Sequence, residues 1–334
     1  MPSPFPSSAE AVRVDADIVF AERDTGELVL DLYRPSGTGS PVPVVLWLHG
    51  GGWFTGDRTL APDLSRHVLT TGCAVASIEY RLSGQAVFPA QVHDVRAAIR
   101  FLRAGARQYG LDPRAVGVWG ASAGGHLAVL AGLTGQVAQL PGEDSAGDAS
   151  VQAVAESYAP VDLAAVVAEA GPSLPGSDAA TSPEARLLGG HPAELPELAR
   201  AANPLTWVSD SAPPFQISHG TGDVLVHHRQ SERLHEALTA AGVHSELYLL
   251  EGYRHGFLNP PGRLDVELAR VMDDGRLQTE GAARAVRRTS QSTTPAEETT
   301  FGFADIESFF RRHLSHDAAA ETAHTTHTTT GESL

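Results

Sequence analysis

The most constraining stretch of this sequence is a Gly-x-Ser-x-Gly motif at residues 120–124. An apolar run, Ala115–Trp119, precedes the motif and predicts a buried strand, while Gly125–Leu133 is rich in alanine and leucine and predicts a buried helix. A strand that turns directly into a helix leaves little space at the turn, so glycine is expected at both ends of the motif. The serine between them would take a strained backbone conformation that lifts its hydroxyl above the sheet, beside the positive end of the helix. This context predicts that Ser122 is a nucleophile.

Strand and helix signals alternate along most of the chain, which predicts an α/β domain with a parallel sheet. The chain has 334 residues, of which 42% are hydrophobic, so we expect a single large domain over residues 11–315. Residues 316–334 are rich in threonine, alanine and histidine without periodicity, and disorder is expected there. The other predicted strands are a hairpin of Val12–Ala21 and Leu28–Tyr33, followed by Val44–Leu48, Cys73–Ile78, Val151–Ala159, Pro213–Ser218 and Ser245–Leu250. The predicted helices are Leu60–Thr70, Pro89–Tyr109, Arg229–Ala241 and Asp305–Leu314.

Two segments interrupt this alternation. Residues 163–202 contain short alanine-rich helical stretches broken by glycine and proline, and we interpret them as a small cap inserted over the strand ends. Residues 260–300 follow the last predicted strand, and we expect one amphipathic stretch there and then a loop rich in serine, threonine and glutamate. The apolar residues of the amphipathic stretch are Leu264, Val266, Leu268, Val271 and Met272.

The charge balance excludes two classes of partner. The formal net charge of −16 argues against nucleic acid and against an anionic membrane surface, because both require basic patches. No apolar run approaches the roughly 18 residues of a membrane span, and Met1–Glu10 lacks the regions of a secretory signal, so we expect a cytoplasmic protein. The single cysteine, Cys73, excludes an intramolecular disulfide and begins an apolar run, which favours a buried thiol. We expect no cofactor and no metal; the histidines of the tail are interpreted as solvated.

A glycine-rich loop follows the strand predicted at Val44–Leu48. Its sequence is His-Gly-Gly-Gly-Trp, residues 49–53. Consecutive glycines at a strand end let backbone N–H groups approach a ligand closely, and such fixed donors can stabilise an oxyanion. We therefore predict that the backbone N–H groups of Gly51 and Gly52, together with that of Ala123 after the serine, form an oxyanion hole. His49 is interpreted as a structural residue that holds the loop.

A serine nucleophile needs a general base and a carboxylate that orients the base. In a parallel sheet such groups lie on the loops that follow the carboxyl ends of strands. Asp223 follows the strand predicted at Pro213–Ser218, and His255 follows the strand predicted at Ser245–Leu250. Both residues lie in turns flanked by glycine. The sequence thus predicts a catalytic triad of Ser122, Asp223 and His255.

Other polar residues compete for these roles, and we predict a structural role for each. His219 lies at the strand end itself, and His126 lies one turn into the helix after the serine. His227 and His228 begin a helix, so we expect them to be exposed. Asp210 lies before its strand and therefore at the wrong end of the sheet.

These residues resemble those of α/β-hydrolase esterases, namely the hormone-sensitive-lipase-like group and, more closely, the bacterial bifunctional feruloyl and acetyl-xylan esterase family. The likeness runs from about residue 12 to 258 and resumes over Phe301–Leu314. The matching stretches are His49–Trp53, Glu79–Ser83, Phe88–Gln91, Tyr109–Pro113, Gly117–His126, Asp223 and His255-Gly256.

The resemblance implies an α/β-hydrolase fold with an eight-stranded, mostly parallel sheet and a small helical cap, and the hydrolysis of carboxylic esters. We expect a small diffusible substrate with a short- to medium-chain acyl or aryl group, because the absence of a visible secretory signal does not suit an enzyme of plant cell-wall polymers. An amidase of the arylformamidase kind and a non-catalytic binding member of the fold are alternatives. The segment 260–300 departs from the family pattern, and we expect it to reshape the pocket or to form a contact between copies in a homo-oligomer.

Overall fold

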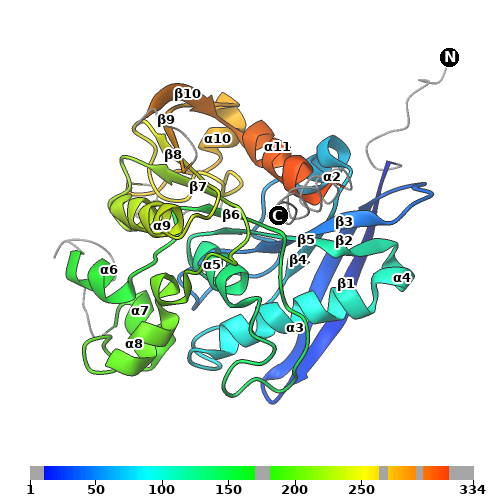
Figure 1. Cartoon of the computed structure of the whole chain (residues 1–334), viewed down its shortest axis with the longest axis horizontal. Helices are drawn as coiled ribbons and strands as arrows, with labels where there is room; N and C mark the ends of the chain where they lie inside the picture. Colours follow the sequence, from blue (N-terminus) through cyan, green and yellow to red (C-terminus); the bar gives the residue numbers. More distant parts are fainter. Residues whose placement is uncertain (1–10, 170–180, 263–269, 291–295, 316–334) are drawn as a thin grey trace, which may run out of the picture.

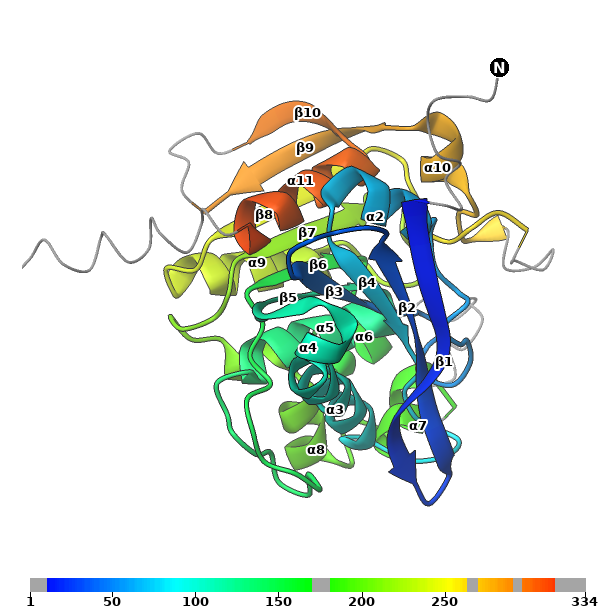
Figure 2. The same cartoon turned by 90° about the vertical axis from the view of Figure 1, so that its right-hand side faces the viewer.

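A single twisted sheet runs through the molecule, with helices on both of its faces (Figures 1 and 2). The computed structural model describes residues 11–169, 181–262, 270–290 and 296–315. In this part of the chain the sheet has ten strands in the order β1-β2-β4-β3-β5-β6-β7-β8-β9-β10. The strands are β1 Val12–Arg23, β2 Gly26–Pro35, β3 Val42–Leu48, β4 Ala74–Ile78, β5 Leu111–Ala121, β6 Ala153–Ser157, β7 Phe215–Gly220, β8 Ser245–Leu250, β9 Ala283–Thr289 and β10 Glu297–Phe301.

The centre of the sheet is parallel and its two edges are antiparallel. Strands β4, β3, β5, β6, β7 and β8 pair in parallel, whereas β1 and β2 form the predicted hairpin at one edge and β9 and β10 form another at the other edge. The register places Leu48 opposite both Ile78 and Gly120, and Leu250 opposite Gly220. The carboxyl ends of the parallel strands therefore align, and the loops that follow them meet at one edge of the sheet.

Burial on both faces explains the continuous apolar runs of the central strands. In β3, Val44, Leu46 and Leu48 belong to one apolar cluster, while Val45 and Trp47 belong to a second cluster on the opposite face. Because successive side chains of a strand point to opposite faces of the sheet, burying all of β3 requires an apolar cluster on each face.

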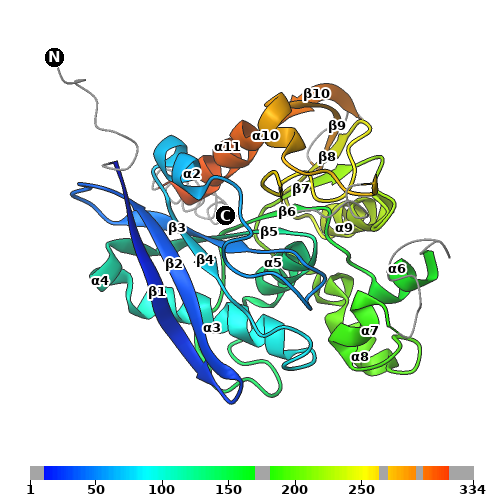
Figure 3. The same ribbon diagram turned by 180° about the vertical axis from the view of Figure 1, so that it is seen from behind.

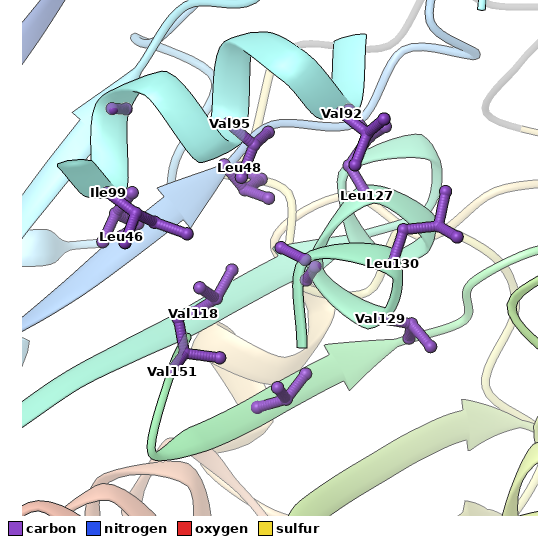
Figure 4. Close-up of a cluster of buried hydrophobic side chains, with 14 of the residues drawn as sticks. Leu46, Leu48, Val92, Val95, Ile99, Val118, Leu127, Val129, Leu130 and Val151 are labelled. Atoms are coloured by element: carbon purple, nitrogen blue, oxygen red, sulfur yellow. The ribbon is translucent and has the colours of Figure 1, made fainter. Parts of the chain in front are cut away.

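Helices α3 (Ala90–Ala104) and α5 (Ala123–Thr134) cover the first face. Figure 4 shows Val95 and Leu127 of these helices packed with Leu48 of β3 and Val118 of β5. Helix α9 (Arg229–Ala240) adds Leu234 to the same cluster.

Helices α2 (Leu64–Thr71) and α11 (Phe303–Leu314) cover the second face, where Val68 and Phe309 are fully buried. Helix α2 begins later than predicted because Asp63 caps it by accepting a hydrogen bond from the Arg66 N–H. The long helix predicted at Pro89–Tyr109 is broken at Gly105 into α3 and the short α4 (Ala106–Tyr109).

The segment 260–300 corrects two predictions. The loop predicted in its second half is wrong, because Ala283–Thr289 and Glu297–Phe301 are strands, and the sheet consequently has ten strands instead of eight. Ala283 and Ala285 alternate with arginine and are buried, but alanine is too small and arginine too polar for this period to stand out in the sequence. Helix α10 (Arg276–Glu280) precedes these strands, and Leu264, Val266 and Leu268 lie outside the described residues.

Short helices form the described part of the predicted cap. They are α6 (Leu163–Glu169), α7 (Pro183–Leu188) and α8 (Pro196–Ala202), followed by a 3-10 turn, η1 (Pro204–Trp207). Figure 3 shows α6, α7 and α8 grouped together beyond the sheet. Among the helices that the structure describes, none combines the length and the apolar character of a membrane span.

Candidate active site

Ser122 lies at the turn between β5 and α5, in a backbone conformation that is unusual for a residue with a side chain. Its φ is 54° and its ψ is −124°. The flanking glycines are sterically required: a Cβ on Gly120 would lie 2.2 Å from the Gly124 carbonyl oxygen, and a Cβ on Gly124 would lie 2.1 Å from the Leu48 carbonyl oxygen. The turn is held by a 2.9 Å hydrogen bond from the Ser122 N–H to the carbonyl oxygen of Ser157. The strained turn predicted from the sequence is therefore present.

The three residues of the predicted triad are hydrogen-bonded in series. His255 Nε2 lies 2.8 Å from Ser122 Oγ, and His255 Nδ1 lies 2.7 Å from Asp223 Oδ2. Asp223 and His255 are 3% and 5% exposed, so solvent does not compete for these contacts. Ser122 Oγ is thus in direct contact with a base whose other nitrogen is held by a carboxylate.

The loops that carry Asp223 and His255 are joined to each other and to the segment after them. The Gly222 N–H donates to the Tyr253 carbonyl oxygen at 2.9 Å, and the Asp273 N–H donates to the His255 carbonyl oxygen at 2.7 Å. Gly220 permits this approach, because a Cβ there would lie 2.2 Å from the Tyr253 carbonyl oxygen. Part of the segment 260–300 therefore supports the histidine loop, which the sequence did not predict.

Asp223 is held as a carboxylate. Burial alone would raise its pKa, but His255 and His219 outweigh that effect and hold the pKa of Asp223 well below its usual range. Oδ1 also accepts hydrogen bonds from the Leu225 and Val226 N–H groups, each at 2.9 Å. A carboxylate with these partners keeps its charge at neutral pH and can stabilise a protonated His255.

The glycine loop after β3 lies against the serine turn. A Cβ on Gly50 would lie 3.3 Å from Ser122 Cβ, and both Gly51 and Gly52 have positive φ values, 105° and 56°. Among the hydrogen bonds of the described residues, none uses the N–H of Gly51, Gly52 or Ala123 as a donor. These N–H groups are therefore unused within the part of the protein that the structure describes.

His49 has the structural role that the sequence predicts. Its Nδ1 lies 2.7 Å from the Gly50 carbonyl oxygen, its ring stacks on Tyr80 at 4.3 Å, and the Tyr80 hydroxyl donates to the His49 carbonyl oxygen at 2.8 Å. Burial lowers the pKa of His49 to about 4, so the ring is neutral at pH 7.

The cap touches both the glycine loop and the helix after Ser122. A Cβ on Gly52 would lie 3.2 Å from Pro183 of α7, and the guanidinium of Arg186 lies 4.8 Å from the ring centre of Phe54. His126 is buried in α5, and its Nε2 lies 2.7 Å from the Ala202 carbonyl oxygen at the end of α8. His126 is therefore a packing residue, as predicted, and it connects α5 to the cap.

One prediction for the remaining competitors is wrong. His227 is exposed, as predicted, but the adjacent His228, the residue before the first turn of α9, is partly buried, because its ring stacks on that of His227 at 4.3 Å and lies 3.8 Å from Glu232. His219 is fully buried beside Asp223 and bonds to Val226 and Ser231 rather than to Ser122. Cys73 is buried, which raises the pKa of its thiol to about 11.

Two residues near the triad were not recognised from the sequence. Tyr158 has a φ of 45°, and its ring meets that of His255 edge to face at 4.7 Å. Glu156 is a carboxyl side chain buried in β6. A charged residue inside the apolar run Val151–Ala159 is a signal that points to Glu156, whereas nothing in the sequence distinguishes Tyr158.

A parallel sheet covered on both faces, with a strained serine turn at its carboxyl edge and Asp223 and His255 on later loops, defines the α/β-hydrolase class of proteins. Comparison with known proteins agrees. The chain matches the family model described as BD-FAE over residues 30–238, and it belongs to that family. Residues 187–290 also match the model of the dienelactone hydrolase family.

The similar proteins are esterases. Esterase LipQ of Mycobacterium tuberculosis is 34% identical over 236 residues, which cover 69% of this chain and 54% of LipQ. A truncated carbohydrate esterase from gut microbiota is 29% identical with a TM-score of 0.65, covering 75% of this chain and 92% of that one. Esterase 2 of Thermogutta terrifontis with butyrate bound is 25% identical with a TM-score of 0.60, covering 79% and 91%. The chain spans about half the length of the curated relatives it matches.

Proposed function

We propose that this protein is a serine carboxylesterase that hydrolyses small carboxylic esters through an acyl-enzyme, with Ser122, His255 and Asp223 as its catalytic triad. The observation that carries the proposal is the series of contacts from Ser122 Oγ through His255 to Asp223 Oδ2, at 2.8 Å and 2.7 Å. The family to which the chain belongs and the esterase relatives support the same reaction class.

In the acylation step, Ser122 Oγ attacks the ester carbonyl carbon while His255 Nε2 takes the hydroxyl proton. Asp223 stabilises the resulting imidazolium and keeps Nδ1 protonated. The carbonyl oxygen becomes an oxyanion, for which the unused N–H groups of Gly51, Gly52 and Ala123 are the donors. Collapse of the tetrahedral intermediate breaks the bond to the alcohol, and His255 returns its proton to the leaving oxygen.

In the deacylation step, a water molecule takes the place of the alcohol. His255 removes a proton from this water, which attacks the acyl carbon, and the same N–H groups hold the second oxyanion. The intermediate expels Ser122 Oγ, which recovers its proton from His255, and the carboxylic acid leaves. Each proton removed by His255 is returned within the same half-reaction.

Esters with short acyl chains or aryl groups are the substrates that we propose. The Thermogutta terrifontis esterase 2 has butyrate, a four-carbon acid, bound in one structure and propionate bound in another. The cap helix α7 lies against Phe54 and Gly52, so it borders the proposed oxyanion hole. A wall at this place restricts the size of the groups that bind beside Ser122.

A panel of p-nitrophenyl esters from acetate to decanoate, with matched p-nitroanilides, tests this proposal. We expect turnover of the short esters, weak turnover of the anilides, and loss of activity in Ser122→Ala. Ser65→Ala, in α2 on the other face of the sheet, is the matched control and is expected to retain full activity. A fluorophosphonate adduct mapped to any serine other than Ser122 contradicts the assignment, and faster anilide than ester turnover favours an amidase.

A further inference from the structure

We propose that Glu156, Ser231 and His219 form a buried hydrogen-bonded chain that positions Asp223, so that the proposed triad is supported from behind by a second histidine. This inference rests on the proposed function, because it assigns the three residues as positioning residues for that reaction. None of them touches the substrate or Ser122.

The chain ends on the same oxygen that holds the base. His219 Nε2 lies 3.3 Å from Asp223 Oδ2 and 2.8 Å from the Val226 carbonyl oxygen. On the other side of the ring, His219 Nδ1 lies 2.8 Å from Ser231 Oγ, and Ser231 Oγ lies 3.2 Å from Glu156 Oε1. The residues come from β6, β7 and α9, so the chain joins two strands and a helix beneath the Asp223 loop.

Because these residues are buried, each of their polar atoms needs a hydrogen-bond partner within the protein. His219 and Ser231 are 0% exposed and Glu156 is 1% exposed, so no polar atom among them can turn to bulk water. A carbonyl oxygen only accepts hydrogen bonds, so His219 Nε2 carries a proton, which it donates to Val226 at 2.8 Å with Asp223 Oδ2 also 3.3 Å away.

The direction of the other bonds follows from Glu156. Its Oε2 accepts a hydrogen bond from the Ala159 N–H at 3.0 Å, while burial raises the pKa of Glu156 to about 8 despite that bond and the contact with Ser231. The proposed chain holds Glu156 in its protonated form at neutral pH, with the proton on Oε1, because Oε2 already accepts from the Ala159 N–H. It donates to Ser231 Oγ, and the Ser231 hydroxyl donates to His219 Nδ1, which leaves His219 neutral.

A neutral His219 has a functional consequence. It gives Asp223 a hydrogen-bond donor without placing a second full positive charge beside it, so the carboxylate keeps its attraction for a protonated His255. A cationic His219 at this distance would instead compete with His255. The chain thus fixes the position of Asp223 while preserving the charge that the reaction uses.

Other titratable groups surround the chain. Tyr158, after β6, has its pKa raised by burial and by Asp223 and Glu156, and it stays protonated at neutral pH. From the start of α9, His228 faces His219, and burial lowers its pKa. The other charged or titratable groups there are His227, Arg229 and Glu232, of which Glu232 lies 3.8 Å from His228.

The test compares two buried histidine–serine pairs. His235 lies in α9, and its Nδ1 is 2.9 Å from Ser245 Oγ. It therefore makes the same kind of histidine–serine contact as His219, but no hydrogen bond or ion pair among the described residues joins it to Asp223. The variants are His219→Leu, His219→Gln and Glu156→Gln, with His235→Leu as the control. The measurements are kcat, KM and kcat/KM of the full chain between pH 5 and 9 on p-nitrophenyl acetate, together with thermal unfolding.

We expect His219→Leu to lower kcat/KM about tenfold, mainly through kcat, because a hydrogen bond to a charged group is lost. The acid limb of its plot of kcat/KM against pH is expected to move to higher pH by roughly half a unit or more, since Asp223 without that donor attracts the His255 proton more strongly. His219→Gln restores a donor and recovers part of the loss. Glu156→Gln keeps the donor and acceptor pattern of a protonated carboxyl, so its kcat/KM is expected to stay within about twofold of that of the natural protein.

Two outcomes overturn the proposal. In one, His219→Leu and His235→Leu lose the same thermal stability and the acid limbs of their kcat/KM–pH profiles coincide. The other is a Glu156→Gln variant as impaired as His219→Leu, because an ionised Glu156 would then be the active form.

A measurement without substrate separates this proposal from the esterase assignment. In ¹⁵N-histidine-labelled protein, with the signal assigned through His219→Gln, His219 is expected to remain the neutral Nε2–H tautomer from pH 6 to 8. Titration of His219 to an imidazolium in that range contradicts the neutral chain. A protein that shows the tautomer but hydrolyses no ester refutes the proposed function and leaves the chain in place.

Discussion

Gly124→Ala is the sharpest test of the serine turn. The added Cβ would lie 2.1 Å from the Leu48 carbonyl oxygen and 2.4 Å from that of His49. Both are backbone atoms at the end of β3, so roughly 1 Å of relative movement between α5 and the glycine loop is needed to reach an ordinary contact. We expect a loss of about 1–3 kcal/mol in the free energy of unfolding. Because the loop carries the proposed oxyanion donors, we also expect kcat to fall by about 10²-fold.

Gly132→Ala is the matched control for this variant. Gly132 lies in the same helix, where the new Cβ would meet the Val154 side chain at 2.5 Å, and both variants replace a glycine of α5 by alanine. The control is expected to lose stability but to keep its kcat, because no part of the serine turn moves. Urea unfolding and p-nitrophenyl acetate kinetics measure the two effects. A Gly124→Ala variant with unchanged kcat, or one as stable as the natural protein, refutes the steric reasoning.

Three other changes have expected outcomes. Asp223→Asn is expected to lower kcat on the order of 10³-fold or more, measured by ester hydrolysis at pH 7.5, because the amide cannot hold His255 Nδ1 protonated. Burial and the nearby Arg66 lower the pKa of His67 to about 3, so the stability that neutral His67 contributes is complete above its unfolded pKa near 6.5 and is lost as the pH falls. As the pH falls from 7.5 to 5, the natural protein is expected to lose about 2 kcal/mol more of its free energy of unfolding, measured in urea, than His67→Phe does, at about 1.4 kcal/mol per pH unit below 6.5. Parallel plots of unfolding free energy against pH for the two proteins would contradict this. Phe310→Ala, which empties a fully buried site on the second face of the sheet, is expected to cost about 3–5 kcal/mol of unfolding free energy, and a cost below 1 kcal/mol would contradict its place in the core.

The local patterns of the sequence were sufficient for the parallel centre of the sheet. Strands buried on both faces need continuous apolar runs, and Val44–Leu48 and Ala115–Trp119 show such runs followed by glycine-rich turns. The position of each polar residue relative to its strand then predicted which side chains meet, since aligned strand ends bring Ser122, Asp223 and His255 together.

The edge of the sheet formed by β9 and β10 was not predictable in the same way. Strands β9 and β10 carry arginine, glutamate and threonine. Their structure depends on the pairing of β9 with β8 and of β10 with β9, rather than on their apolar content. The support of the His255 loop by Asp273 likewise depends on hydrogen bonds to His255 and Arg254, between segments that share no motif.

The sequence by itself determined the strand-to-helix turn at Ser122 and the glycine loop at residues 49–53, because these depend on steric limits and on spacing within a few residues, and it gave the order of the proposed triad along the strands. Only the tertiary structure decided that Glu156, Ser231 and His219 lie in series behind Asp223. Those three residues come from separate strands and a helix, and the direction of their protons depends on complete exclusion of water. Burial of that kind is a property of the packed sheet, which no local pattern encodes.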